Sequence, residues 1–166
     1  MYDELTEVDL KKMQEEIDYR IQVLRPKLIE DVQTARAFGD LSENFEYKCA
    51  KRDKNRNDSR IRYLQRMIAT AKVIAPQSSE DAVGLFDTVT VFHEGLQKEM
   101  TLRLVTTLRQ DALKGLISKE SPVGKALLGH KAGDRVPVRV GENQYVMVIR
   151  SIRKGEDDDS LAISSY

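Results

Sequence analysis

The hydrophobic residues near the start of the chain recur at helical spacing. Between Leu10 and Ala35 they stand three or four residues apart, which averages close to the repeat of an α-helix. The full set is Leu10, Met13, Ile17, Ile21, Leu24, Leu28, Val32 and Ala35. The pattern predicts one amphipathic helix that begins near an Asp9 N-cap, is mildly kinked at Pro26 and ends at Gly39.

A second stripe of apolar positions, from Tyr47 to Ala71, predicts another helix of similar length. Two long amphipathic helices joined by a few residues pair antiparallel, and each would be roughly 45 Å long. Such a narrow apolar seam is typical of a coiled coil. We therefore expect an antiparallel coiled-coil hairpin over residues 1–75, with its tip at residues 39–44.

The middle of the second helix contains a long polar run. No residue between Lys51 and Arg60 is apolar. Extending the helical register back from Ile61 puts Lys54 and Asn57 in the seam, where polar residues lower stability but fix the register. We expect the part of the hairpin near the tip to be weakly held.

The period changes in the second half of the chain. Turn-forming residues cluster at 76–82, which we interpret as a linker. The segments that follow predict a β-hairpin of 86–92 and 100–106, a helix at 123–128 capped by Ser121 and stopped by Gly129, and strands at 135–140 and 145–152. The fold class is therefore α+β, with an antiparallel-sheet domain at 83–153 and an acidic, disordered tail at 154–166.

Composition narrows the classes of function. The chain has 166 residues, 27 basic and 27 acidic, so any nucleic-acid contact must come from local charge asymmetry. One cysteine, Cys49, cannot form an internal disulfide, and two distant histidines do not make a zinc site. Neither a signal-type nor a membrane-length apolar run occurs, so we expect a cytoplasmic protein with no membrane partner.

Charge is unevenly distributed along the second predicted helix. The segment from Lys48 to Arg66 contains eight basic residues and only two acidic ones, Asp53 and Asp58. A solvated face with ion pairs within the helix is one interpretation, and a surface that follows phosphates is another. No aromatic residue interleaves the run, so the pattern does not indicate base stacking.

Two carboxylates, Asp40 and Glu43, stand three residues apart at the predicted tip. They could form a capping box for the second helix. They could instead share a hard cation such as Mg²⁺, although two carboxylates are only a partial site. An exposed tip has neither a cleft nor walls that exclude water, so the pair would serve only by completing the active site of another molecule.

Two runs of residues carry a family resemblance. Ala35-Arg36-Ala37-Phe38-Gly39-Asp40-Leu41-Ser42-Glu43-Asn44-Phe45-Glu46-Tyr47 closely resembles the signature G-D-L-x-E-N-x-E-Y of bacterial Gre transcript-cleavage factors. Leu116-Ile117-Ser118, then Ser121 to Gly129 and Gly133-Asp134, is similar to that family's second signature. The resemblance extends from Leu10 to about Ile152, with both signatures in the expected order.

The resemblance implies both a fold and an activity. It implies a coiled-coil finger and an FKBP-like C-terminal domain, which docks at the rim of the RNA polymerase secondary channel. The finger would enter the channel and stimulate the polymerase to cut backtracked RNA, so the chain is not itself an enzyme and has no small-molecule substrate. Asp40 and Glu43 match the catalytic tip acids, which hold Mg²⁺ jointly with the polymerase; the free protein would bind no metal stably.

The resemblance also assigns residues around the tip. Arg36, Asn44 and Tyr47 match the surround of the acids, where we expect positioning or packing roles. Lys51, Arg52 and Arg56 fall where the family carries basic residues or close to them, and would guide the 3′ segment of backtracked RNA.

The sequence departs from the family pattern in three places. Phe45 replaces the usual small residue beside the acids, Arg56 and Asn57 replace residues that are commonly apolar, and the acidic tail is an extension. These departures leave open a Gre-like regulator that binds the secondary channel and inhibits or modulates the polymerase without cleavage. A plain coiled-coil adaptor with a capping box at its tip would instead show no dependence on Mg²⁺.

Overall fold

The computed structural model describes residues 3–39, 44–76, 79–158 and 160–165. The chain forms two compact units, a helical unit, Leu10–Ala71, and a sheet unit, Met1–Asp9 with Lys72–Tyr166. The division differs from the predicted boundary at residue 75, because the short strand β1 (Glu4–Leu5) pairs parallel with β2 (Lys72–Val73). The predicted linker 76–82 includes residues 77–78, which lie outside the described part of the chain.

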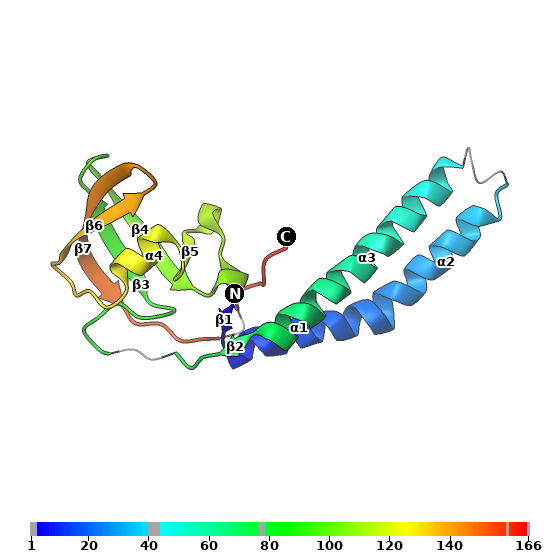
Figure 1. Cartoon of the computed structure of the whole chain (residues 1–166), viewed down its shortest axis with the longest axis horizontal. Helices are drawn as coiled ribbons and strands as arrows, with labels where there is room; N and C mark the ends of the chain where they lie inside the picture. The colour runs from blue at the N-terminus through cyan, green and yellow to red at the C-terminus, as the bar shows by residue number, and fades with distance from the viewer. Residues whose placement is uncertain (1–2, 40–43, 77–78, 159, 166) are drawn as a thin grey trace. The chain divides into compact units, whose positions relative to one another are not determined.

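The helical unit is the expected hairpin. Its first arm comprises most of α1 (Glu7–Tyr19), a π-helical turn η1 (Arg20–Leu24) and α2 (Arg25–Arg36), and its second arm is α3 (Phe45–Thr70). Figure 1 shows α2 and α3 lying side by side. Hydrogen bonds join Glu16 to Arg60 far from the tip and Ala35 to Asn44 at the tip, so the arms are antiparallel.

The π-helical turn explains how the first arm passes Pro26. Proline has no backbone N–H and would leave a normal helical hydrogen bond unmade. Here Pro26 stands in the first turn of α2, and the N–H of Arg25 reaches the carbonyl of Arg20, five residues earlier. The predicted interruption at Pro26 is therefore present as a widened turn immediately before it.

The start of α1 corrects one prediction. The helix begins at Glu7, so Asp9 is not its N-cap. Instead the N–H of Asp9 donates to Thr6 Oγ1 (3.3 Å), and the N–H of Thr6 donates to Asp9 Oδ2 (3.0 Å). This reciprocal arrangement is a capping box with Thr6 as the cap. Asp9 is buried, and because Thr6 binds only its Oδ2, its second carboxylate oxygen is available for another partner.

The sheet unit is built on five strands in the order β5-β4-β3-β7-β6. The elements are β3 (Thr88–His93), β4 (Lys98–Val105), η2 (Thr107–Arg109), η3 (Ala112–Lys114), β5 (Leu116–Ser118), α4 (Pro122–Leu127), β6 (Arg135–Val140) and β7 (Asn143–Arg153). The α+β class, the first β-hairpin and the short helix with its Ser121 cap are confirmed. The sheet is mixed rather than wholly antiparallel, because the two 3₁₀ turns return the chain so that β5 pairs parallel with β4.

The core of the sheet unit lies under α4. Alternate residues of the strands are buried there, among them Val89, Val91, Leu104, Val138 and Ile149. Gly124 of α4 sits directly on β5, since a Cβ at this position would lie 2.1 Å from the carbonyl oxygen of Ser118. A glycine is therefore required for this close approach of helix and strand.

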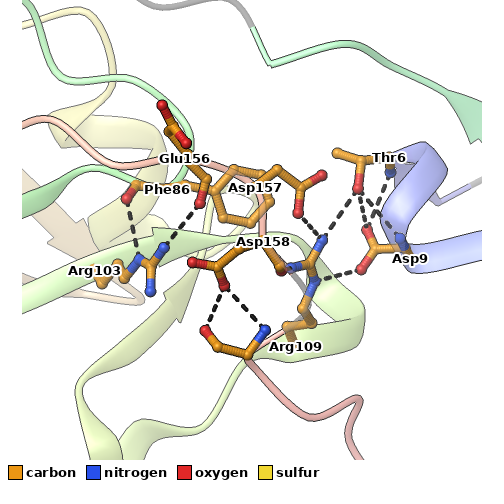
Figure 2. A network of polar contacts seen from close by, with 9 residues as sticks. Thr6, Asp9, Phe86, Arg103, Arg109, Glu156, Asp157 and Asp158 are labelled. Atoms are coloured by element: carbon orange, nitrogen blue, oxygen red, sulfur yellow. Dashed lines mark hydrogen bonds and ion pairs between the residues drawn. The ribbon is translucent and has the colours of Figure 1, made fainter. Parts of the chain in front are cut away.

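The described part of the C-terminal segment, residues 154–158 and 160–165, makes specific contacts, which differs from the disordered tail predicted at 154–166. Lys154 pairs with Asp87, Leu161 packs beside Phe86, and the N–H of Ser164 donates to the carbonyl of Leu108 (2.6 Å). Figure 2 shows the acidic residues of the segment beside two arginines, with Asp157 paired to Arg109. The acidic composition suggested solvation, but the buried Arg109 and the partly buried Arg103 of the same unit hold this segment.

Candidate functional site

The two predicted tip acids, Asp40 and Glu43, lie outside the described residues. Their catalytic and metal-binding roles therefore stay predictions. The structure describes the ends of the hairpin on both sides of them, up to Gly39 and from Asn44 onward.

Asn44 ties the ends of the two arms together. Its Oδ1 accepts a hydrogen bond from the N–H of Tyr47 (3.0 Å), which makes it the N-cap of α3. Its Nδ2 donates to the carbonyl of Ala35 (2.6 Å) near the end of α2. One side chain thus satisfies an orphan donor of α3 and adds a second hydrogen bond to the carbonyl of Ala35, which also accepts from the N–H of Phe38 (3.2 Å). Because α3 is capped by Asn44, the capping-box interpretation of Asp40 and Glu43 does not hold for this helix.

Arg36 and Tyr47 form a second link across the tip. Arg36 Nη2 donates to Tyr47 Oη (3.4 Å), and the guanidinium carbon lies 5.6 Å from the ring centroid. The hydrogen bond from Arg36 lowers the pKa of Tyr47 below its ordinary value, and Lys51 adds to the effect through its charge. The three predicted positioning residues therefore come together, and each joins the arms by packing or hydrogen bonding.

The predicted basic face is only partly paired. Lys54 pairs with Asp58 (3.2 Å), and Arg60 pairs with Glu16 of the first arm (2.8 Å). Within the described ranges, no ion pair involves Lys51, Arg52 or Arg56, and all three are exposed. The interpretation of ion pairs within the helix thus holds for Lys54, whereas Arg60 pairs across the hairpin. Lys51, Arg52 and Arg56 remain available to an outside anion.

A polar network fills the middle of the hairpin seam. Asn57 is 3% exposed and accepts from Arg20 Nη1 (2.9 Å), as its predicted seam position requires. Glu16 accepts from both Arg20 and Arg60 (2.8 Å each). Burial by itself would raise the pKa of Glu16, but the hydrogen bonds from Arg60 and Arg20 lower it below the ordinary value.

Sequence reasoning missed Glu16 and Arg60, because charged residues on a helix usually face solvent. The register offered a signal: Arg60 follows the seam residue Asn57 by three positions, so both belong to one face of α3.

The described residues give no indication of a metal cluster or of a membrane-spanning helix. In residues 3–39, 44–76, 79–158 and 160–165, no group of three His, Cys, Asp or Glu side chains could hold a metal ion. Over the same ranges, no helix is long and apolar enough to cross a membrane.

A helical hairpin with a tied tip, followed by a mixed-sheet unit, defines a two-unit protein that presents its tip on a long helical support. Family models match both units: residues 4–73 match the transcription elongation factor N-terminal model, and residues 77–154 match the GreA/GreB C-terminal model. The chain belongs to the GreA/GreB family of transcription elongation factors. The resemblance seen in the sequence is confirmed.

Two GreA relatives agree with this assignment. The chain is 42% identical to the transcription elongation factor GreA of Thermoanaerobacter pseudethanolicus over 151 residues, 90% of this chain and 96% of that one. It is 37% identical to GreA of Bacillus licheniformis over 148 residues, 88% of this chain and 94% of that one. Among solved structures, the GreA factor homolog Gfh1 of Thermus thermophilus is 20% identical to this chain. The match covers 93% of this chain and 100% of that one, with a TM-score of 0.43.

Proposed function

We propose that this elongation factor binds RNA polymerase, inserts its helical tip into the secondary channel, and stimulates the polymerase to cleave backtracked nascent RNA. The relatives that cover nearly the whole chain are named transcription elongation factor GreA, and RNA polymerase is the partner that this name implies. The observation that carries the proposal is the tied tip: Asn44, with the Arg36–Tyr47 pair, fixes both helix ends around the segment that contains Asp40 and Glu43.

The helical unit supports a probe-like role. At about 1.5 Å per residue, the 26 residues of α3 extend for about 39 Å. A narrow hairpin of this length can carry a small group of side chains into a channel while the sheet unit remains outside, at the channel rim. The tip ties then serve precision, because carboxylates that assist a reaction must be held within a fraction of an ångström of their working positions.

The residue types at the tip fit magnesium chemistry that is shared with another protein. Carboxylate oxygens suit Mg²⁺, and two of them leave most of its coordination sphere to water or to a partner. Asp40 and Glu43 would hold the ion jointly with acids of the polymerase, and the free chain would not retain it. When bound, such an ion supplies activation of water and stabilisation of a leaving oxygen in phosphodiester hydrolysis. The chain itself contributes position and charge.

A cleavage assay on a backtracked elongation complex tests the proposal. Asp40→Asn with Glu43→Gln removes both charges while keeping side-chain size. The matched control is Glu30→Gln with Asp31→Asn, an exposed Glu and Asp on α2 of the same hairpin. We expect the tip variant to bind the polymerase as the wild type does and to lose RNA cleavage, while the control keeps both.

Two other outcomes are informative. Full cleavage by the tip variant would refute the role of the acids. A wild-type chain that binds the polymerase and slows nucleotide addition without cleavage would identify the non-cleaving channel regulator instead.

A further inference from the structure

Two exposed phenylalanines flank the tip. Phe38 is 71% exposed and Phe45 is 76% exposed, although the fold gains nothing from an aromatic ring in solvent. Full burial of a phenylalanine side chain would stabilise the folded chain by about 1.5–3 kcal/mol, and neither residue contributes this stabilisation. Phe45 is the first residue of α3, where strong helix formers would serve the helix better. The rings are therefore available to a partner.

Phe45 shares its helix face with the unpaired cations. Phe45, Lys48, Arg52 and Arg56 are three or four residues apart, so they fall within an arc of about 80° around α3. All four are exposed, and within the described ranges none of the three cations has an ion-pair partner. We call these four residues the basic stripe.

The stripe faces away from the interior of the hairpin. The buried residues of α3, which are Asn57, Arg60, Ile61 and Leu64, are centred about 130° around the helix from it. The acidic residues of the same part of α3, Glu46 and Asp53, fall outside the arc of the stripe. They lie about 100° and 80° around the helix from Phe45, on the side toward the buried face. An aromatic ring thus stands at the tip end of a continuous, outward row of positive charge.

We propose that Phe45 stacks on a nucleobase of single-stranded RNA whose phosphates lie along Lys48, Arg52 and Arg56. Single-stranded nucleic acid combines a regular row of negative charge with accessible flat apolar faces, and proteins bind it with cations that follow the backbone and aromatic side chains that stack on bases. The row from Phe45 to Arg56 is about 16 Å long, enough to accompany about three to five nucleotides at 3.4 Å each.

This inference rests on the proposed function for where the RNA lies, since the 3′ segment of backtracked RNA would pass the tip. It goes beyond the guiding of phosphates that the sequence predicts for the basic residues. The sequence pattern did not indicate stacking because no aromatic residue interleaves the basic run. The helical arrangement places Phe45 at the end of the same face, next to the segment with the acids. Phe45 would act as a positioning residue that fixes which nucleotide lies beside the tip.

Binding of the full chain to a short single-stranded RNA tests the inference without the polymerase. Phe45→Leu keeps an apolar side chain but removes the aromatic face, and Phe45→Tyr keeps that face. Phe38→Leu is the matched control, because Phe38 is an equally exposed phenylalanine outside the stripe. The readouts are fluorescence anisotropy for affinity and the quenching of 2-aminopurine in the RNA for stacking.

We expect Phe45→Leu to weaken binding about 5- to 150-fold, the range for loss of one stacked base, and to abolish the quenching. Phe45→Tyr and Phe38→Leu should bind as the wild type does. An RNA of the same length without bases should bind the wild type and Phe45→Leu equally. Lys48→Ala and Arg52→Ala should each lower the slope of log affinity against log salt concentration by about 0.7, the value for one phosphate of a single strand.

Several results would overturn the inference: wild-type affinity and quenching in Phe45→Leu, the same loss with the base-free RNA, or no RNA binding by the wild type at low salt. Loss of polymerase binding by Phe45→Leu in the absence of RNA would assign the ring to a protein surface instead. Because cleavage and its dependence on Asp40 and Glu43 are measured separately, failure of stacking leaves the proposed function standing, and the reverse also holds.

Discussion

Arg109 offers the most informative test of what holds the sheet unit together. Its side chain is 1% exposed, and its Nε donates to Asp9 Oδ1 (2.6 Å). The same guanidinium pairs with Asp157, donates to Thr6 Oγ1 (3.1 Å), and lies 4.7 Å over the ring of Phe86 (Figure 2). One cation therefore joins the N-terminal segment, the turn after β4 and the C-terminal segment. We predict that Arg109→Met strongly destabilises the sheet unit.

The magnitude follows from what the substitution leaves behind. Methionine fills much of the volume, but the carboxylate of Asp9 stays fully buried without its cation. Breaking a buried ion pair by removing one partner costs about 3–5 kcal/mol. If Asp9 is also replaced, in Asp9→Ala with Arg109→Met, no fully buried charge remains unpaired, and Asp157 is left with a side chain that is 9% exposed. The double variant should therefore be no less stable than Arg109→Met alone.

Arg103 provides the matched control. It too lies over Phe86, at 6.0 Å, and its hydrogen bonds go to the backbone carbonyls of Phe86 (3.0 Å) and Glu156 (3.1 Å). Arg103→Met leaves no carboxylate without a partner, so we expect a loss of about 1 kcal/mol. The assay is amide hydrogen exchange in β3, β4 and β7 of the full chain, which follows the sheet unit separately from the hairpin. Equal losses for the two arginines would refute the reasoning that the buried pair dominates.

Three further predictions concern the hairpin and the C-terminal segment. Because the pKa of Glu16 in the folded state lies below its ordinary 4.5, its contribution to hairpin stability is present above pH 4.5 and is lost as the pH falls further. Glu16→Gln should therefore reduce the dependence of the hairpin's unfolding temperature on pH below pH 4.5, and an unchanged dependence would contradict this. Asn44→Asp should keep the cap of α3 but lose the bond to Ala35, whereas Asn44→Ala should lose both and cost about 0.5–2 kcal/mol, which exchange at the Tyr47 amide would report. Gly155→Ala would put a Cβ 2.0 Å from the carbonyl oxygen of Phe86, so it should displace the C-terminal segment and allow trypsin to cleave after Lys154. Gly95→Ala is the control and should not increase this cleavage, because its Cβ would meet only the His93 side chain, at 3.1 Å.

The site could be predicted from the sequence to the extent that its residues carry a signature. The run from Ala35 to Tyr47 identified the tip and the three residues around it. The resemblance did not reveal how they act, because that depends on contacts between two arms. Asn44 caps α3 and holds α2 at once, and the exposed ring of Phe45 gains its place from the helical face that it shares with Arg52.

The sequence by itself determined the local structure. The spacing of apolar residues defined the hairpin arms, the alternation defined the strand pair β3–β4, and Ser121-Pro122 with Gly129 bounded α4. These features depend on neighbours within a few residues, which a pattern records directly.

Only the tertiary structure decided the roles of the charged residues. Asp9 was expected as the N-cap of the first helix, yet it is buried against Arg109, 100 positions away in the chain. The acidic C-terminal segment is held, and Glu16 and Arg60 meet inside the hairpin, although each alone is typical of a solvated surface. A charged side chain has the same local pattern whether it faces water or an opposite charge. The physical reason is that its burial depends on a partner that only the folded chain brings within reach.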